Sequence, residues 1–120
     1  MTDIEVLNSS RGLFPSQLRF FKDGSLILSL KDNLIKEMAD IKIQLNGILV
    51  FHDTGIIGKR ITFCDSGSPG YIYSEYAILN KLKPFDFKKY VFFVDDGKQY
   101  ELIVVCKSIE IVRMQNAILN

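Results

Sequence analysis

Three glycine-containing turn sequences constrain the fold of this chain more than any other feature. Asp23-Gly24 and Asn46-Gly47 each separate two short apolar runs, and Asp95-Asp96-Gly97 separates two longer ones. Such sequences favour β-hairpins, because their central residues must adopt positive φ, which glycine, asparagine and aspartate tolerate best. The chain is therefore expected to consist of antiparallel strands joined in pairs. The predicted hairpin strands are residues 18–21 with 26–28, 41–45 with 48–51, and 90–94 with 100–106.

Shorter signals complete an α+β pattern. Two helices are predicted, one over residues 33–39 capped by Asp32 and one over residues 75–82 capped by Ser74. The expected apolar faces are Leu34, Ile35 and Met38 in the first helix and Ile78, Leu79 and Leu82 in the second. Few helices separate the strands, which argues against parallel βαβ units. The expected fold is a mainly antiparallel, hairpin-rich sheet with one or two short helices packed on it. The remaining predicted strands are residues 4–7, 60–64 and 109–113.

The length and charge of the chain restrict its class. With 120 residues, 48% of them hydrophobic, the chain is expected to form a single globular domain over residues 1–120. A net charge of +1 argues against a general nucleic-acid coat. Asp3 and Glu5 stand where a signal peptide would need basic residues, and no apolar run is long enough to cross a membrane. We therefore expect a cytoplasmic protein that does not insert in membranes.

The inventory of metal ligands and thiols is small. Cys64 and Cys106 both lie inside apolar runs, which predicts two buried thiols rather than a disulfide. Together with the single histidine, His52, they cannot form a typical zinc site. No cofactor and no metal site are predicted.

One segment suggests protease chemistry. Asp53-Thr54-Gly55 follows an apolar strand and resembles the catalytic motif of retroviral-type aspartic proteases. The resemblance implies a homodimer in which each subunit supplies one catalytic aspartate, here Asp53. His52 stands where that family prefers an apolar residue, and Ile56-Ile57-Gly58 follows at once instead of far downstream. The alternative, which we favour, is a turn in which the Asp53 carboxylate binds its own backbone.

A second segment, residues 65–69, resembles the nucleophile loop of chymotrypsin-like serine proteases, with Ser66 in the register of the nucleophile and Ser68 nearby. Cys64 occupies the position of the glycine that serves the oxyanion hole in that family. A chain of 120 residues cannot form the two barrels of that fold. This segment is therefore interpreted as a flexible loop.

Aromatic and basic residues alternate over residues 81–90, in the style of a surface for single-stranded nucleic acid. The same rings can equally belong to the core, with the lysines keeping an edge strand soluble. Because no other basic cluster accompanies this segment, the core interpretation is preferred.

Two groups of side chains are predicted to bind a partner. Tyr71, Tyr73 and Tyr76 lie next to the flexible loop, and tyrosine is favoured at interface hot spots. Asp95 and Asp96 form a second patch. We therefore predict a non-enzymatic, protein-binding domain, most concretely an immunity protein that neutralises a bacterial toxin domain. The alternatives are an aspartic-protease-like homodimer and a phage or structural interaction protein.

Overall fold

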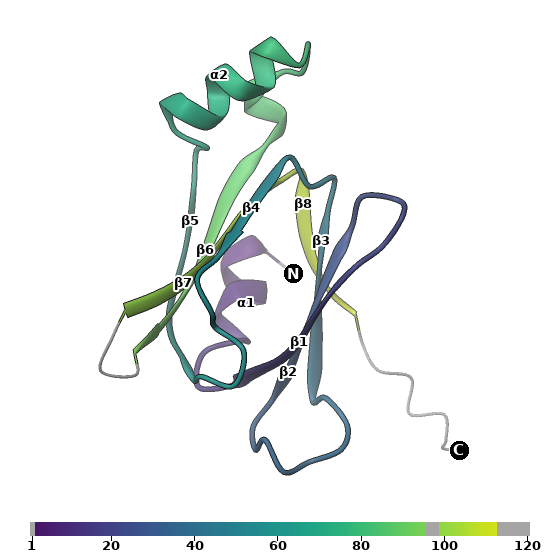
Figure 1. Ribbon diagram of the computed structural model, residues 1–120, viewed down its shortest axis with the longest axis vertical. Helices are drawn as coiled ribbons and strands as arrows, with labels where there is room; N and C mark the ends of the chain where they lie inside the picture. Colours follow the sequence, from purple (N-terminus) through teal and green to yellow (C-terminus); the bar gives the residue numbers. More distant parts are fainter. Residues whose placement is uncertain (1, 96–98, 113–120) are drawn as a thin grey trace.

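The computed structural model describes residues 2–95 and 99–112 and has an α+β architecture (Figure 1). Its strands form two four-stranded antiparallel sheets, one in the order β1-β2-β3-β8 and the other in the order β4-β7-β6-β5. The predicted antiparallel, hairpin-rich α+β fold is confirmed. The elements are α1 (Asp3–Asn8), β1 (Phe14–Phe20), β2 (Leu26–Lys31), β3 (Ile41–Asn46), β4 (Val50–Asp53), β5 (Ile61–Gly67), α2 (Tyr71–Leu79), the 3-10 helix η1 (Pro84–Asp86), β6 (Lys88–Asp95), β7 (Gln99–Cys106) and β8 (Ser108–Val112).

Two of the three predicted hairpins are present. β1 pairs with β2, and β6 pairs with β7 up to Asp95 opposite Gln99, while residues 96 and 97 of that turn lie outside the described residues. In the first hairpin the Phe21 amide donates to the Ser25 carbonyl at 2.9 Å. Gly24 has φ +85°, whereas Asp23 does not have positive φ. The connection is therefore a three-residue loop closed by a left-handed glycine rather than a two-residue primed turn.

The predicted hairpin at Asn46-Gly47 is wrong. β3 pairs with β2 and β8, and β4 lies in the other sheet beside β7. Across the junction the Lys107 amide donates to the Asn46 carbonyl at 2.9 Å, and the Leu49 amide donates to the Val105 carbonyl at 2.8 Å. Gly47, with φ +64°, bends the strand from one sheet into the other instead of reversing it. The strands β7 and β8 make the same change of sheet, because β8 pairs with β3 on one side of the bend and β7 pairs with β4 on the other.

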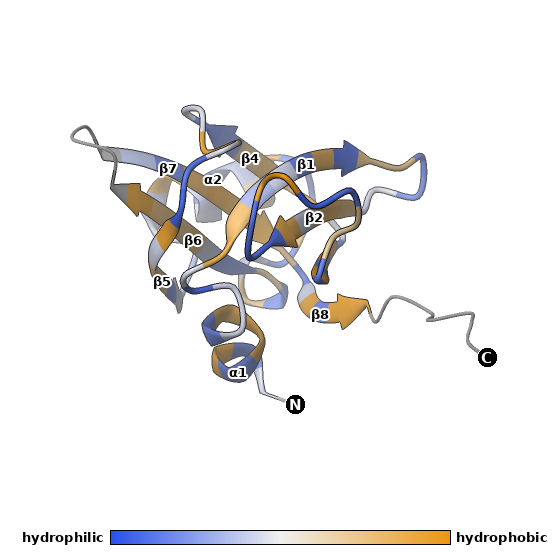
Figure 2. Cartoon of the chain, turned by 90° about the horizontal axis from the view of Figure 1, so that it is seen from below, coloured by the Kyte–Doolittle hydropathy of each residue, from blue (hydrophilic) through white to orange (hydrophobic). Residues whose placement is uncertain are grey.

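The far edges of the two sheets meet at one end of the molecule. The Gly12 amide donates to the Ile61 carbonyl at 2.8 Å, and the Ile61 amide donates to the Leu13 carbonyl at 2.9 Å. The two sheets thus enclose one core, and α1 packs against β5 and β8 in the remaining opening (Figure 1). Figure 2 shows apolar residues on strands of both sheets and on α1. The core is made of Val6, Leu7, Leu26, Leu28, Leu30, Ile43, Leu45, Ile56, Ile61, Tyr90, Phe92, Val94, Leu102, Val104, Cys106 and Ile109.

The predicted strand over residues 4–7 is wrong, because this segment belongs to helix α1. The Glu5 amide donates to Thr2 Oγ1 at 3.2 Å, and the Thr2 hydroxyl donates to the Glu5 carboxylate at 3.1 Å. Thr2 is therefore the N-cap of the helix, and its hydroxyl also binds the Glu5 side chain. Val6 and Leu7 then pack into the core, where burial offsets the low intrinsic stability of so short a helix. The strands predicted at 60–64 and 109–113 are confirmed as β5 and β8, except that residue 113 lies outside the described residues.

The predicted helix over residues 33–39 is also wrong. The segment between β2 and β3 is a loop, in which the Ile35 amide donates to Asn33 Oδ1 at 3.1 Å. Lys36 Nζ joins Asp32 at 3.1 Å and Asp40 at 2.5 Å. Local side-chain bonds of this kind replace helical hydrogen bonds, and the apolar residues of the segment find no surface to cover.

The second predicted helix is confirmed with other bounds. α2 begins at Tyr71 after Gly70, which has φ +87°, so Ser74 lies inside the helix and does not cap it. The helix ends at Leu79. The Leu82 amide then donates to the Ala77 carbonyl at 2.8 Å, and Lys81 has φ +60°. This is a Schellman motif with lysine in the position that usually holds glycine.

Candidate functional site

Helix α2 projects beyond both sheets, and η1 is its main neighbour (Figure 1). Only Ala77 of this helix is buried, and Tyr73 and Ser74 are half-buried. The other side chains of the helix are exposed. The predicted apolar face of this helix therefore does not pack on the sheet.

The exposed side of α2 is apolar over most of its length. Leu79 is 81% exposed, and Phe85 of the adjoining η1 is 82% exposed. Glu75 is the single charged residue of the helix, and a hydrogen bond from the Tyr71 hydroxyl to its carboxylate raises the pKa of Tyr71. We define the α2 surface as the exposed side chains of Tyr71, Ile72, Tyr76, Ile78, Leu79 and Leu82.

Such a surface is unusual for a helix on its own. A helix that is hydrophobic all round is normally buried on every side, yet here only the side facing η1 is covered. Contiguous apolar patches on folded proteins mark binding sites more often than isolated apolar residues do. The α2 surface is thus the leading candidate for a contact with another molecule.

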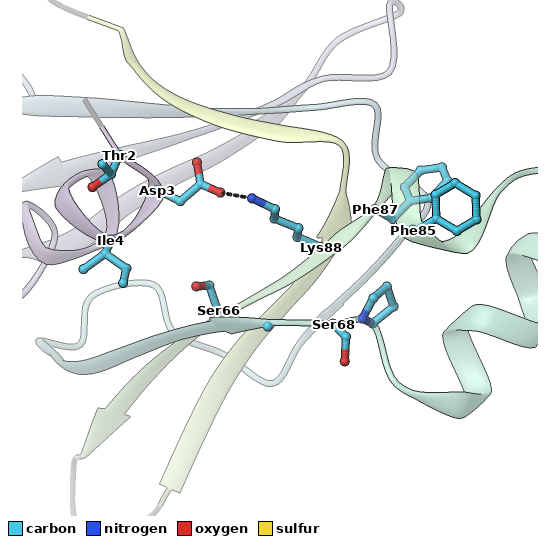
Figure 3. Close-up of a pocket in the computed structure, with 10 residues that line it drawn as sticks. Thr2, Asp3, Ile4, Ser66, Ser68, Phe85, Phe87 and Lys88 are labelled. Atoms are coloured by element: carbon cyan, nitrogen blue, oxygen red, sulfur yellow. Dashed lines mark hydrogen bonds and ion pairs between the residues drawn. The ribbon is translucent and has the colours of Figure 1, made fainter.

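A groove of about 600 Å³ lies between the start of α1, the end of β5 and η1 (Figure 3). Asp3 is one of the residues that line this groove. The Asp3 carboxylate accepts hydrogen bonds from Lys88 Nζ at 3.0 Å and from the Tyr90 hydroxyl at 2.7 Å. The bond from Tyr90 and the charge of Lys88 lower the pKa of Asp3. Burial, together with the Asp3 carboxylate, raises the pKa of Tyr90. The groove is lined by Thr2, Asp3, Ile4, Ser66, Gly67, Ser68, Pro69, Phe85, Phe87 and Lys88.

The residues predicted to bind a partner are not all in one place. Tyr71 and Tyr76 belong to the α2 surface, whereas Tyr73 is half-buried on the other side of the helix. Asp95 ends β6, about 23 Å along the strand from its start beside η1. Asp96 lies outside the described residues.

Several residues of the exposed surface are not predicted from the sequence. The sequence gives no signal for a role of Ile72, predicts Ile78 and Leu79 on a buried helix face, and favours a core position for Phe85, whereas all four side chains are exposed. One feature of the sequence could have indicated these residues. Apolar residues occur on every side of α2, which is more than a helix with one buried face needs.

The protease-like segment at Asp53 forms a turn. The Gly55 amide donates to Asp53 Oδ1 at 2.8 Å, and the Ile56 amide donates to the same oxygen at 3.1 Å. The predicted Asx-type turn is thereby confirmed. One oxygen of the Asp53 carboxylate thus accepts hydrogen bonds from its own backbone.

The residues considered for a serine-protease site do not converge. His52 on β4 is opposite Ile103 on β7, which is opposite Val91 on β6, which is opposite Asp65 on β5. His52 is therefore three strand spacings, about 14 Å, from the residue next to Ser66.

Of the lysines and aromatic residues over residues 81–90, some lie in the core and others on the surface. Phe87 and Tyr90 are buried, which favours the core interpretation of these two rings. Lys88 is paired with Asp3, while Phe85 is exposed beside the groove.

Both cysteines are free thiols. Burial raises the pKa of Cys106 to about 12, and burial also raises the pKa of the half-buried Cys64. Such thiols are weak nucleophiles at neutral pH. Within residues 2–95 and 99–112, no three His, Cys, Asp or Glu side chains are grouped so that they can hold a metal ion.

No helix in the described part of the chain has both the length and the apolar character needed to cross a membrane. Comparison of the chain with protein-family models, with curated proteins and with solved structures finds no match.

Proposed function

We propose that this chain is a non-enzymatic protein-binding domain that docks on another protein through the α2 surface. The observation that supports this proposal is the outward apolar face of α2, which neither sheet covers. An apolar helix of this size fits a hydrophobic groove on a partner, a common mode of recognition between proteins.

The position of Glu75 favours a different protein as the partner over a lipid membrane or a second copy of this chain. Tyr71, Glu75 and Leu79 follow one another at intervals of four residues, so the carboxylate lies in the middle of the face. An anionic lipid surface would repel it. A two-fold contact between copies of this chain, centred on the face, would bring two such carboxylates together. A different protein can instead place a hydrogen-bond donor opposite Glu75.

The most concrete form of this function is an immunity protein, which binds a toxin domain inside the producing cell. This assignment is based on the absence of sequence motifs for other functional classes. It is also based on the small interface that such inhibitors need, roughly 800 Å² on each side. A toxin reading frame next to the gene would support it. Neighbouring capsid or tail genes would favour a phage or structural interaction protein instead.

Position-specific crosslinking in cells tests the docking surface. A photoreactive p-benzoylphenylalanine at position 79 is expected to give one stoichiometric crosslink to another protein, because the Leu79 side chain is 81% exposed on this surface. The matched control places the same group at Ile35, which is 87% exposed in the loop between β2 and β3. This loop and α2 lie at opposite ends of the molecule (Figure 1). The control is expected to give no such product.

The crosslinked protein is then purified and titrated. Leu79→Asp is expected to weaken its binding about tenfold or more, as loss of a central apolar contact does. Ile35→Asp is expected to leave binding unchanged. Both variants should keep the free energy of unfolding within about 0.5 kcal/mol, because both side chains are exposed. Crosslinks from position 79 only to lipid or to a second copy, or no crosslink there, would contradict the proposal.

A further inference from the structure

The groove at the start of α1 lies next to helix α2. Pro69, which lines the groove, immediately precedes Gly70, the first capping residue of α2. Phe85 lines the groove from η1, the element against which α2 packs. Tyr71 of the α2 surface follows Pro69 by only two residues, so a protein seated on this surface is within reach of the groove.

The walls of the groove are largely apolar. Ile4 is 62% exposed and Phe85 is 82% exposed, while Phe87 and Pro69 are buried behind them. The volume of about 600 Å³ lies within the range of ligand pockets, and apolar walls with a few polar groups are typical of such sites. The groove is thus large enough for a ring and its neighbouring atoms.

The charges at the groove are already balanced. The Asp3 carboxylate is held by the Lys88 ammonium at 3.0 Å and by the Tyr90 hydroxyl at 2.7 Å. An ionic ligand would lose its hydration and find no uncompensated charge in exchange. An uncharged ligand avoids this cost, so the groove selects against carboxylates and ammonium groups.

The Ser66 hydroxyl is an uncharged polar group of the groove. The Ser66 side chain extends from β5 toward the space between Ile4 and Lys88 (Figure 3). A hydroxyl can donate to or accept from the polar tip of an aromatic ring, such as a phenol O–H or an indole N–H. Apolar walls with an uncharged hydroxyl therefore match tyrosine and tryptophan, the rings that are also enriched at interface hot spots.

We infer that the groove receives a tyrosine or tryptophan side chain of the protein that docks on the α2 surface. The inference rests on the proposed function, since it assigns an anchor residue to the same partner. The α2 surface supplies apolar contact area, and the groove adds selection for an uncharged aromatic ring with a polar tip.

Side-chain analogues test the groove without the partner. In two-dimensional amide NMR spectra of the full chain, p-cresol and indole are expected to shift resonances of residues 66–68 and 88, with a dissociation constant on the order of 1 mM. Benzoate and benzylammonium are expected to bind at least about fivefold more weakly, because they are charged. No localised shifts, or equal binding of the charged analogues, would overturn the inference.

Two variants assign the contacts. Phe85→Ala, which removes an exposed wall, is expected to weaken p-cresol binding at least about fivefold. Phe63→Ala, a half-exposed phenylalanine on β5 outside the groove, serves as its matched control and is expected to have no effect. Ser66→Ala is expected to weaken p-cresol but not toluene, which has no polar tip. Equal loss for both compounds would contradict the role of the hydroxyl.

The partner identified by crosslinking separates this inference from the proposed function. Ser66→Ala and Phe85→Ala are expected to weaken its binding at least about threefold. If Leu79→Asp abolishes partner binding while both groove variants leave it unchanged, the α2 surface remains the docking site and the aromatic anchor is refuted. Binding of p-cresol without any effect of the variants on the partner would also refute the anchor, because the groove would then be a small-molecule site.

Discussion

The hydrogen bond between Tyr90 and Asp3 offers the most direct test of how α1 is held on the sheets. Tyr90 is completely buried, and its hydroxyl donates to Asp3 at 2.7 Å. Tyr90→Phe keeps the ring and removes this bond. A hydrogen bond to a charged group contributes about 1.5–3 kcal/mol. Asp3 keeps Lys88 at 3.0 Å and some contact with water, so we expect a loss at the lower end, about 1.5 kcal/mol, or about 5 °C in Tm.

The pH dependence of this loss identifies its origin. The pKa of Asp3 is lowered in the folded state, first by the bond from Tyr90. The stabilisation is therefore fully present above the ordinary carboxyl pKa of about 4 and disappears as the pH falls through the lower, folded pKa. Urea unfolding of the unmodified protein and of Tyr90→Phe is expected to show the full difference in the free energy of unfolding at neutral pH and a smaller difference in acid.

A matched control and two outcomes decide this prediction. Tyr76→Phe changes a half-exposed tyrosine of the α2 surface and is expected to alter stability by less than about 0.5 kcal/mol. If Tyr90→Phe were as stable as the unmodified protein, the hydroxyl would not hold α1 in place. A difference of the same size at neutral and acid pH would show that Asp3 is not the group responsible.

Two further predictions concern backbone conformation and are checked by urea denaturation. Gly24→Val and Gly47→Val should each lower the free energy of unfolding by about 1–2 kcal/mol, because both glycines have positive φ, and Gly47→Val should cost more since a Cβ there would lie 2.9 Å from the Lys107 side chain. No loss at either site would contradict the turn assignments. Lys81→Gly should raise stability by about 1 kcal/mol, because Lys81 has φ +60° in a position that favours glycine. An unchanged or lower stability would contradict a strained left-handed lysine.

Local sequence signals predicted the turns of this fold better than they predicted which strands pair. Asp23-Gly24 and Asn46-Gly47 carry the same kind of signal, and both glycines do adopt positive φ. One closes a hairpin, whereas the other bends a strand into a second sheet. The difference comes from β7 and β8, more than 50 residues away, which pair on both sides of the bend. No local pattern contains that information.

The N-terminal helix was predictable but was assigned as a strand. Thr2 and Glu5 are three residues apart, which is the spacing of a capping box, and in the structure the Glu5 amide does donate to Thr2 Oγ1. The apolar content of residues 4–7 outweighed this signal. For residues 33–39 the error is the reverse, because a helical spacing of apolar residues was present but Asn33 and the pairing of Lys36 with two aspartates stabilise a loop.

Helix α2 illustrates why a functional surface is harder to predict than a fold. Periodicity identifies which residues are apolar, and for α2 it suggested a buried face containing Ile78 and Leu79. Whether such a face is buried depends on whether the rest of the chain reaches it, and here the sheets end short of the helix. Exposure of that face lowers the stability of the isolated chain, and a partner that covers it recovers the lost hydrophobic contribution. The same residues that were expected to stabilise the domain are therefore those expected to bind its partner.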